Sequence, residues 1–201
     1  MIRSVWLVVA LAVAAPGAQA ELSAREREDA VAHLQSSQKA FFAAIRGLTP
    51  SQWRFKPAPD RWSISEIADH LDLAEVKTLE LVRGPILQSP PVAGGELKGK
   101  EERVYKEIAD RSMHRMTRPD FLAPSDRWAS PADVMRDFAA NRAKTVEYVR
   151  TTQDDLRAHA APHPEMGMLD GYEWIALLAA HAERHTAQIR EVKTHPKFPA
   201  K

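Results

Sequence analysis

The sequence contains no cysteine, and this absence excludes several kinds of chemistry at once. Disulfide bonds, thiolate metal ligands and cysteine nucleophiles are all ruled out. The fold must therefore be held together by its core alone. Sustained alternation of apolar and polar residues, the signature of strands, is also missing, so the chain is predicted to be all-α.

An excess of basic charge is missing as well. The chain has 28 Lys+Arg and 27 Asp+Glu, a formal net charge of +1. If the first twenty residues are removed, Arg3 leaves with them and the remainder is formally neutral (28 − 1 = 27 against 27). No obvious run of lysine or arginine occurs either. A nucleic-acid partner is therefore not predicted.

The first twenty residues differ in character from the rest. Arg3 is their only charge, residues 5–15 form an almost unbroken apolar run, and a small-x-small motif ends at Ala20. These features predict a secretory signal peptide over residues 1–20, cleaved after Ala20. The mature domain, residues 21–201, is then expected to be periplasmic or secreted, with no stable membrane span. The alternative is an uncleaved anchor or a buried first helix.

Four segments show the period of amphipathic helices. Ser63, Ser130 and Asp170 are suitable N-terminal caps for the second, third and fourth segments. The predicted helices cover about residues 23–47, 64–83, 131–152 and 171–194. This pattern predicts a four-helix bundle.

The connection between the second and third helices is long, from about residue 85 to residue 130. A short helix is predicted inside it, over residues 101–111. So long a crossover can return the chain to the end from which it started. The second and third helices are therefore expected to run parallel.

The last predicted helix contains a His-x-x-x-His pair, His181 and His185. Side chains four positions apart on a helix are rotated by about 40° and separated by about 6 Å along its axis, so both imidazoles project from one face. The pair lies within an apolar stripe that faces the bundle interior, where imidazoles need partners. A metal ion would satisfy them as neutral rings. The alternative is two core histidines hydrogen-bonded to their neighbours.

A catalytic zinc site usually has three protein ligands and an open position. His70, at the edge of the apolar face of the second helix, is the best candidate for the third ligand. The remaining histidines are predicted near helix ends or in loops: His33, His114, His159, His163 and His195.

Other catalytic motifs fail on spacing or composition. Residues 94–100 resemble a phosphate-binding loop, but Glu101 replaces the required Ser or Thr. Glu183 lies one place too late for a His-Glu-x-x-His zinc protease. Three tryptophans are expected to be packing residues rather than a binding box: Trp53, Trp62 and Trp174.

Two stretches of the chain resemble the DinB-like (YfiT-like) domain family, and the similarity covers about residues 25–195. The first stretch is Trp53-x-x-Lys56-Pro57 followed by Trp62-Ser63-Ile64-x-Glu66-Ile67-x-x-His70-Leu71. The second is His163-Pro164-x-Met166-Gly167-x-Leu169-x-Gly171-Tyr172-x-Trp174 followed by His181-x-x-x-His185-x-x-Gln188-Ile189.

The resemblance implies a four-helix bundle of up-down-down-up order. It also implies a divalent metal, zinc or nickel, held by His70, His181 and His185. Relatives include thiol-dependent S-transferases and isomerases, and proteins described as metal-dependent hydrolases. A signal peptide departs from the cytoplasmic thiol transferases, because low-molecular-weight thiols are mainly cytosolic.

The favoured hypothesis is a metal-dependent hydrolase or transferase that acts on a small molecule. Glu66, one turn before His70, is a candidate base, although its place in a capping box explains it better. Gln188, one turn after His185, is a candidate to orient water or substrate. One alternative is a non-catalytic metal- or ligand-binding protein of the cell envelope. Another treats the histidines as vestigial and the bundle as a dimerisation module.

Overall fold

The computed structural model describes residues 21–92, 99–112 and 120–200. The predicted signal peptide, residues 1–20, lies outside these described residues. Among the described helices, none is both long enough and apolar enough to cross a membrane.

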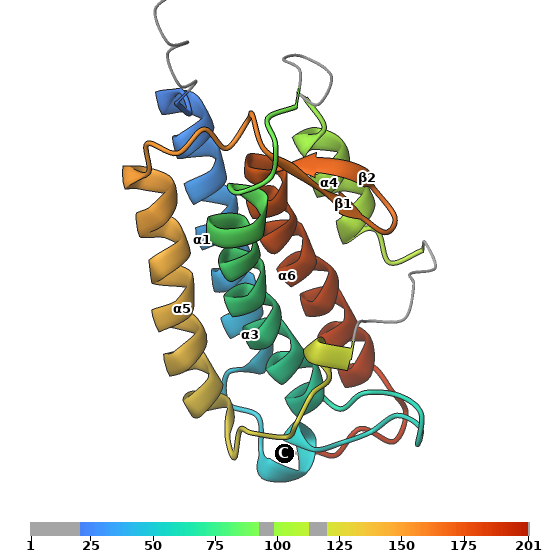
Figure 1. Ribbon diagram of the computed structural model, residues 1–201. Coiled ribbons are helices and arrows are strands. Elements are labelled where there is room, and N and C mark those ends of the chain that lie inside the picture. The colour runs from blue at the N-terminus through green and yellow to red at the C-terminus, as the bar shows by residue number, and fades with distance from the viewer. Residues whose placement is uncertain (1–20, 93–98, 113–119, 201) are drawn as a thin grey trace, which may run out of the picture.

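Four long helices form the body of the molecule (Figure 1). They are α1 (Ala24–Ile45), α3 (Ile64–Leu81), α5 (Pro131–Thr151) and α6 (Gly171–Lys193). All four predicted helices are confirmed. Their ends agree closely because local capping determines them.

The N-terminal caps satisfy backbone amides that have no partner inside the helix. Ser63 and Glu66 form a reciprocal capping box at the start of α3, and Asp170 and Glu173 form one at the start of α6. The hydroxyl of Ser130 likewise accepts a hydrogen bond from the third residue of α5. These are the caps that the sequence predicted.

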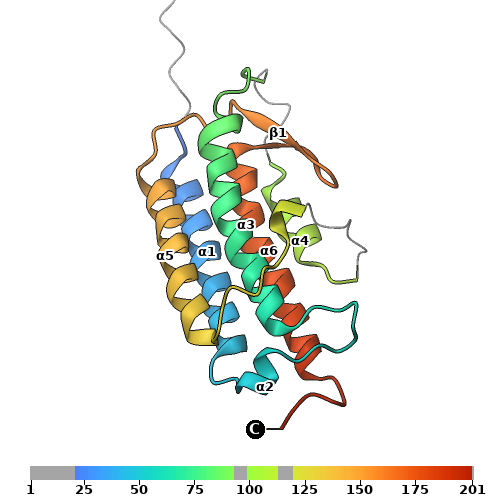
Figure 2. The same cartoon turned by 60° about the horizontal axis from the view of Figure 1, so that its bottom comes forward.

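The order of helix directions is up-down-down-up, as predicted. Asp72 and Glu75 of α3 contact Asn141 and Thr145 of α5, so the contacts advance in the same direction along both helices. The two helices are therefore parallel, and α1 and α6 run the opposite way (Figures 1 and 2). Around the bundle, each of α1 and α3 packs against both α5 and α6.

Two apolar clusters form the core, one towards each end of the bundle. Each long helix contributes residues to both clusters. Buried polar side chains lie near its middle, where the two clusters meet. On the α5 side this layer contains Ser37, Glu75, Arg142 and Thr145, with Arg142 paired to Glu75 at 2.8 Å. On the α6 side the layer contains the histidine pair.

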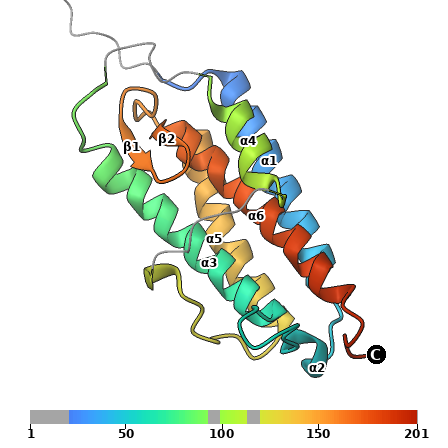
Figure 3. The same cartoon turned by 90° about the vertical axis from the view of Figure 1, so that its right-hand side faces the viewer.

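The crossover between α3 and α5 begins with a π-helical turn, Val82–Ile86. The helical path therefore continues slightly past residue 83, where the sequence predicted that the helix would end. The predicted short helix is confirmed as α4 (Glu101–Ala109), and it packs along α6 (Figure 3). Two further single turns are α2 (Pro50–Trp53) and η2 (Asp120–Leu122).

The sequence did not predict a β-hairpin, yet one precedes α6. Its strands are β1 (Ala160–His163) and β2 (Gly167–Asp170), and they pair antiparallel. The all-α prediction was therefore incomplete, although the fold is mainly helical. Four-residue strands are too short to show alternation. Gly167, with φ of +72°, provides the left-handed conformation that the turn requires.

Candidate metal centre

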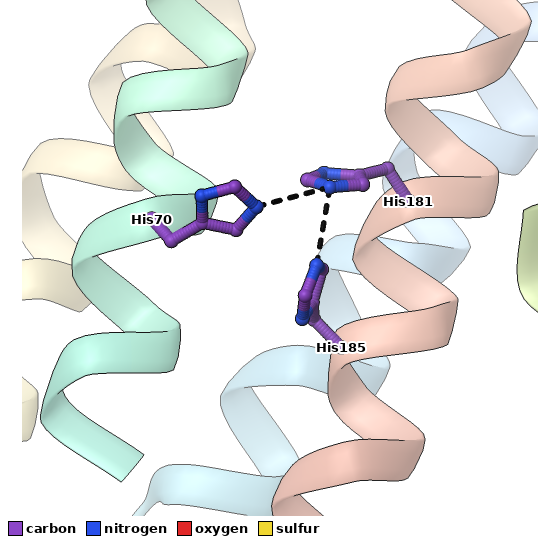
Figure 4. A group of neighbouring side chains, drawn as sticks. All are labelled: His70, His181 and His185. Carbon is purple, nitrogen blue, oxygen red and sulfur yellow. Dashed lines mark hydrogen bonds between the residues drawn. The ribbon is translucent and has the colours of Figure 1, made fainter. Parts of the chain in front are cut away.

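Three histidines converge between α3 and α6. His70 comes from α3, His181 and His185 come from α6, and their side chains point towards one another (Figure 4). Nε2 of His181 lies 3.2 Å from Nε2 of His70 and 3.1 Å from Nε2 of His185. The three potential ligand atoms all lie within 4.8 Å of one another. The structure thus brings together the three residues singled out from the sequence.

Two of these rings have their tautomers set by an oxygen acceptor. Nδ1 of His70 lies 3.0 Å from the carbonyl oxygen of Leu122, and Nδ1 of His185 lies 2.8 Å from Oε1 of Gln188. Because these oxygens only accept, each Nδ1 carries the proton in the neutral ring. The Nε2 atom of each ring is then left with a lone pair directed at the centre of the cluster.

The cluster disfavours additional protons. Burial, and then the neighbouring imidazoles, hold the pKa of His181 and of His185 well below the usual histidine range. Both rings are therefore neutral at pH 7. A single proton on Nε2 of His181 can bridge only one of its two short contacts, so lone pairs face each other across the remaining one. A cation would relieve that repulsion.

The spacing suits nitrogen ligands. Imidazole nitrogens about 2.0–2.1 Å from a tetrahedral zinc ion lie roughly 3.3 Å apart. The two shortest Nε2 separations, 3.1 and 3.2 Å, are close to this value. Three neutral imidazoles are also ligands that zinc, nickel, copper and iron accept. The residues present therefore fit a divalent metal ion.

The histidines form part of the wall of a cavity of about 930 Å³. The cavity runs along α6 and is also bounded by α3, α4 and the hairpin turn. Trp62 covers the histidines on one side, with its ring centroid 4.9 Å from that of His70 and 6.2 Å from that of His185. The site is thus open to a small molecule but partly screened from bulk water.

The tryptophans divide into two groups. Trp53 is fully buried in one apolar cluster and donates to the carbonyl of Trp128, which confirms it as a packing residue. Trp62 and Trp174 line the cavity, so describing them as packing residues was incomplete. Their role depends on which helices surround them, and the chain itself does not show this.

Glu66 and Gln188 have different positions. Glu66 is absent from the described cavity lining, and its carboxylate accepts from the Ser63 amide at 2.7 Å and from Lys56 at 2.9 Å. Burial opposes ionisation, but these hydrogen bonds outweigh it and lower the pKa of the Glu66 carboxyl. The geometry gives no support to Glu66 as a base. Gln188 lines the cavity and holds His185.

One supporting residue was not found from the sequence. Asp69, fully buried beside His70, accepts at 2.6 Å from the backbone amide of Ser125 and at 2.6 Å from Nε of Arg127. This anchor holds the returning crossover against α3, where it delivers the carbonyl of Leu122 to His70. An aspartate followed by a histidine was visible in the sequence, but its partners are more than fifty residues away.

Several other histidines lie elsewhere in the fold. His33, expected near a helix end, lies within α1 and stacks on Tyr105 at 3.9 Å. His159 contacts the carbonyl of Ser89 through Nδ1. His163 ends β1 and lines the cavity, but it is not part of the three-histidine cluster. His114 lies outside the described residues.

The sequence also matches a family model. The model described as the DinB superfamily matches residues 33–189, which is most of the chain. The chain belongs to the DinB superfamily. The matched region contains all three histidines of the cluster, and it includes the long crossover.

Two Bacillus subtilis proteins are similar to this DinB-superfamily chain. The protein YuaE of strain 168, whose function is uncharacterized, is 24% identical over 149 residues, which is 74% of this chain and 88% of YuaE. The structure of YfiT superposes with a TM-score of 0.58 at 14% identity, covering 89% of this chain and 92% of that one. YfiT is described as a probable metal-dependent hydrolase with an unusual four-helix bundle topology. The structural likeness supports the shared fold.

Proposed function

We propose that the chain is a metal-dependent hydrolase that acts on a small molecule in the cavity along α6. His70, His181 and His185 would hold a divalent ion, zinc or nickel. The observation that carries this proposal is the convergence of three Nε2 atoms on the wall of an open cavity, with separations of 3.1 and 3.2 Å to His181. The description of YfiT supports the reaction class.

A divalent ion, when bound, supplies Lewis acidity and lowers the pKa of a water ligand towards neutrality. The protein contributes three neutral imidazoles, which leave the positive charge of the ion undiminished. Leu122 and Gln188 keep two of the rings oriented. Such outer partners normally matter almost as much as the ligands themselves.

The rest of the site would position the substrate. Oε1 of Gln188 is occupied by His185, so the amide nitrogen of Gln188 remains as a hydrogen-bond donor on the cavity wall. Trp62 shields the histidines and presents an aromatic face to the cavity. Glu66, fully engaged in its capping box and with Lys56, would act structurally, by capping the start of the helix that carries His70.

The metal test compares His181→Ala with a matched histidine variant, His159→Ala, outside the cavity. The wild type and His159→Ala should be purified with a stoichiometric divalent metal by elemental analysis, and His181→Ala without it. Metal-free wild type should hydrolyse a small chromogenic ester, such as p-nitrophenyl acetate, only after zinc or nickel is restored. Unchanged metal content in His181→Ala would overturn the assignment.

The alternatives give different results in the same experiment. A protein that binds the metal tightly but never turns over a panel of small esters, amides and lactones would be a binding protein of the cell envelope. A protein that is purified without metal, and whose stability chelators do not change, would have vestigial histidines. A concentration-dependent mass in solution would then point to dimerisation.

We further propose that the protein is exported and that its mature chain begins at Glu21. Cleavage after Ala20 would leave Ser23 and Glu26, which form the capping box of α1, intact. N-terminal sequencing of protein isolated from the periplasm or the medium tests this proposal. A chain that still begins at Met1 would contradict it.

A further inference from the structure

We infer that the substrate is electrically neutral and carries an apolar acyl or aryl group, which occupies one end of the cavity. The apolar chamber is defined here by four side chains: Leu81, Ile108, Trp174 and Leu177. This inference rests on the proposed function for the reactive end of the substrate only. The chamber itself is a property of the described side chains.

The cavity has two chemically different ends because residues of different chemistry follow one another along one face of α6. Trp174, Leu177, His181 and His185 follow one another at steps of three and four, so they share one helix face. Seven residues of helix separate Trp174 from His181, about 10 Å along the axis. One end of the cavity therefore carries the three-histidine cluster, and the other end, two turns away, carries mainly apolar side chains, with His163 beside Trp174.

Three elements build the chamber. Leu81 comes from the end of α3, directly before the π-helical turn, and Ile108 comes from α4. Ile108, Trp174 and Leu177 retain only 4%, 9% and 7% of their surface. The little surface that these residues keep faces a cavity rather than the exterior, which is the arrangement of an apolar binding site.

The hairpin keeps the chamber in shape. The indole nitrogen of Trp174 donates to the carbonyl of Ala161 in β1 at 3.4 Å. The ring of His163 meets the indole edge-to-face, with centroids 5.4 Å apart. Because Trp174 is held from two sides, an apolar ligand would meet a preformed wall and would not have to order it.

Three cations of the cavity wall already have partners. Lys77 pairs with Glu80 at 2.8 Å, and Arg111 makes two contacts with Glu191, at 2.9 and 2.6 Å. Arg184 donates to the carbonyl of Asp110. An anionic group entering the chamber would lose hydration among four apolar side chains, and the three cations named above are already engaged, so the geometry favours a neutral substrate.

The test uses a series of straight-chain hydroxamates, from acetohydroxamate to octanohydroxamate, titrated into the zinc-loaded wild type by calorimetry. The hydroxamate group is expected to bind the zinc ion, and its alkyl chain is expected to extend into the chamber. Affinity should rise roughly threefold to fourfold for each added methylene until the chamber is full. Suberic acid monohydroxamate, which ends in a carboxylate, should lose most of that gain. A flat series, or equal binding of the carboxylate, would overturn the inference.

A substitution that fills the chamber with a larger side chain provides the matched variant. Leu177→Phe should lower the affinity for octanohydroxamate by at least roughly tenfold and leave that for acetohydroxamate unchanged, because only the long chain reaches residue 177. If this buried substitution prevents folding, Leu81→Phe, at a half-buried position, tests the same wall. Equal effects on both ligands would count against the chamber.

A metal-free arm separates this inference from the proposed function. Octanamide, a neutral probe with a weak metal-binding head, should bind the chelator-treated wild type and lose affinity in Leu177→Phe. If octanamide binds in this way but no metal ever does, the proposed function fails and the chamber stands. The opposite result is that metal and acetohydroxamate bind, but affinity does not change with hydroxamate length and octanamide does not bind. The inference about the chamber would then be wrong, and the metal site would stand.

Discussion

Oε1 of Gln188 accepts a hydrogen bond from Nδ1 of His185 at 2.8 Å, one helical turn along α6. This contact selects the tautomer with the proton on Nδ1. The lone pair on Nε2 of His185 then faces the other two histidines. Residue 188 therefore acts on the proposed metal indirectly, by positioning a ligand. This contact to His185 differs from the role predicted from the sequence, which was to orient water or substrate.

Gln188→Ala should weaken zinc binding by roughly 10- to 100-fold, the usual effect of removing an outer hydrogen-bond partner. Gln188→Glu keeps an acceptor in place and should bind zinc much as the wild type does. Competition with a chromophoric chelator measures both. Gln35→Ala, at an exposed position of α1, is the control. Equal zinc affinity in Gln188→Ala and the wild type would show that the contact is incidental.

Asp69→Ala should reduce both stability and zinc affinity. The buried carboxylate accepts from Ser125 and Arg127, and losing such charge-assisted bonds costs about 1.5–3 kcal/mol. Zinc binding should weaken as well because the carbonyl of Leu122 is no longer held against His70. Urea unfolding in chelator, followed by zinc competition, separates the two effects.

Asp137→Ala is the matched aspartate control, since its pair with Arg136 is exposed and should contribute less than about 1 kcal/mol. If Asp69→Ala lost stability but bound zinc normally, the crossover would not orient His70.

For the buried pair of Glu75 and Arg142, removing one partner should cost more stability than replacing both partners with apolar residues. Both side chains are 1% exposed, and the hydroxyl of Thr145 also donates to Glu75 at 2.6 Å. Glu75→Ala leaves the arginine buried without its partner and should lower the free energy of unfolding by about 3–5 kcal/mol. Combining Glu75→Leu with Arg142→Met should recover most of that loss in urea denaturation. A double variant less stable than Glu75→Ala would contradict this account.

Glu173 should titrate near neutrality. Its burial, and then the neighbouring carboxyl of Asp170, raises the pKa of Glu173 from 4.5 to about 7. The folded state therefore binds this proton more tightly than the unfolded state. The stability that Glu173 contributes should be greatest below pH 4.5 and should decline as the pH rises to about 7, by a total on the order of 3 kcal/mol.

Unfolding of the wild type and of Glu173→Gln between pH 5 and pH 8 measures this contribution. Glutamine cannot ionise, so the difference in unfolding free energy between the two proteins should shift in favour of the variant as the pH rises. A difference that does not change with pH would mean that the carboxyl stays ionised in the fold.

Some of the site could be predicted from the chain alone. His181 and His185 share a face because four helical steps make slightly more than one turn, whatever surrounds the helix. The start of α3 at Ser63 and the start of α6 at Asp170 follow from local hydrogen bonds within three residues. Such features need no distant partner, and the structure agrees with each.

Other parts of the site depend on segments that meet only after folding. The Leu122 carbonyl reaches His70 from 52 residues away, through a crossover whose path is set by Asp69 and Arg127. The apolar chamber needs α3, α4 and α6 together, with a hairpin too short to leave a periodic signal. The same residues in another packing would not form this chamber.

The sequence by itself determined the four long helices, their caps and the pairing of His181 with His185, because each depends on contacts within a turn or two of helix. Only the tertiary structure decided that His70 meets that pair, which tautomers the rings adopt, and that a cavity with one polar and one apolar end lies beside them. The physical reason is that these properties arise from distances between different helices. Those distances are set by how whole apolar faces pack, and no single segment encodes them.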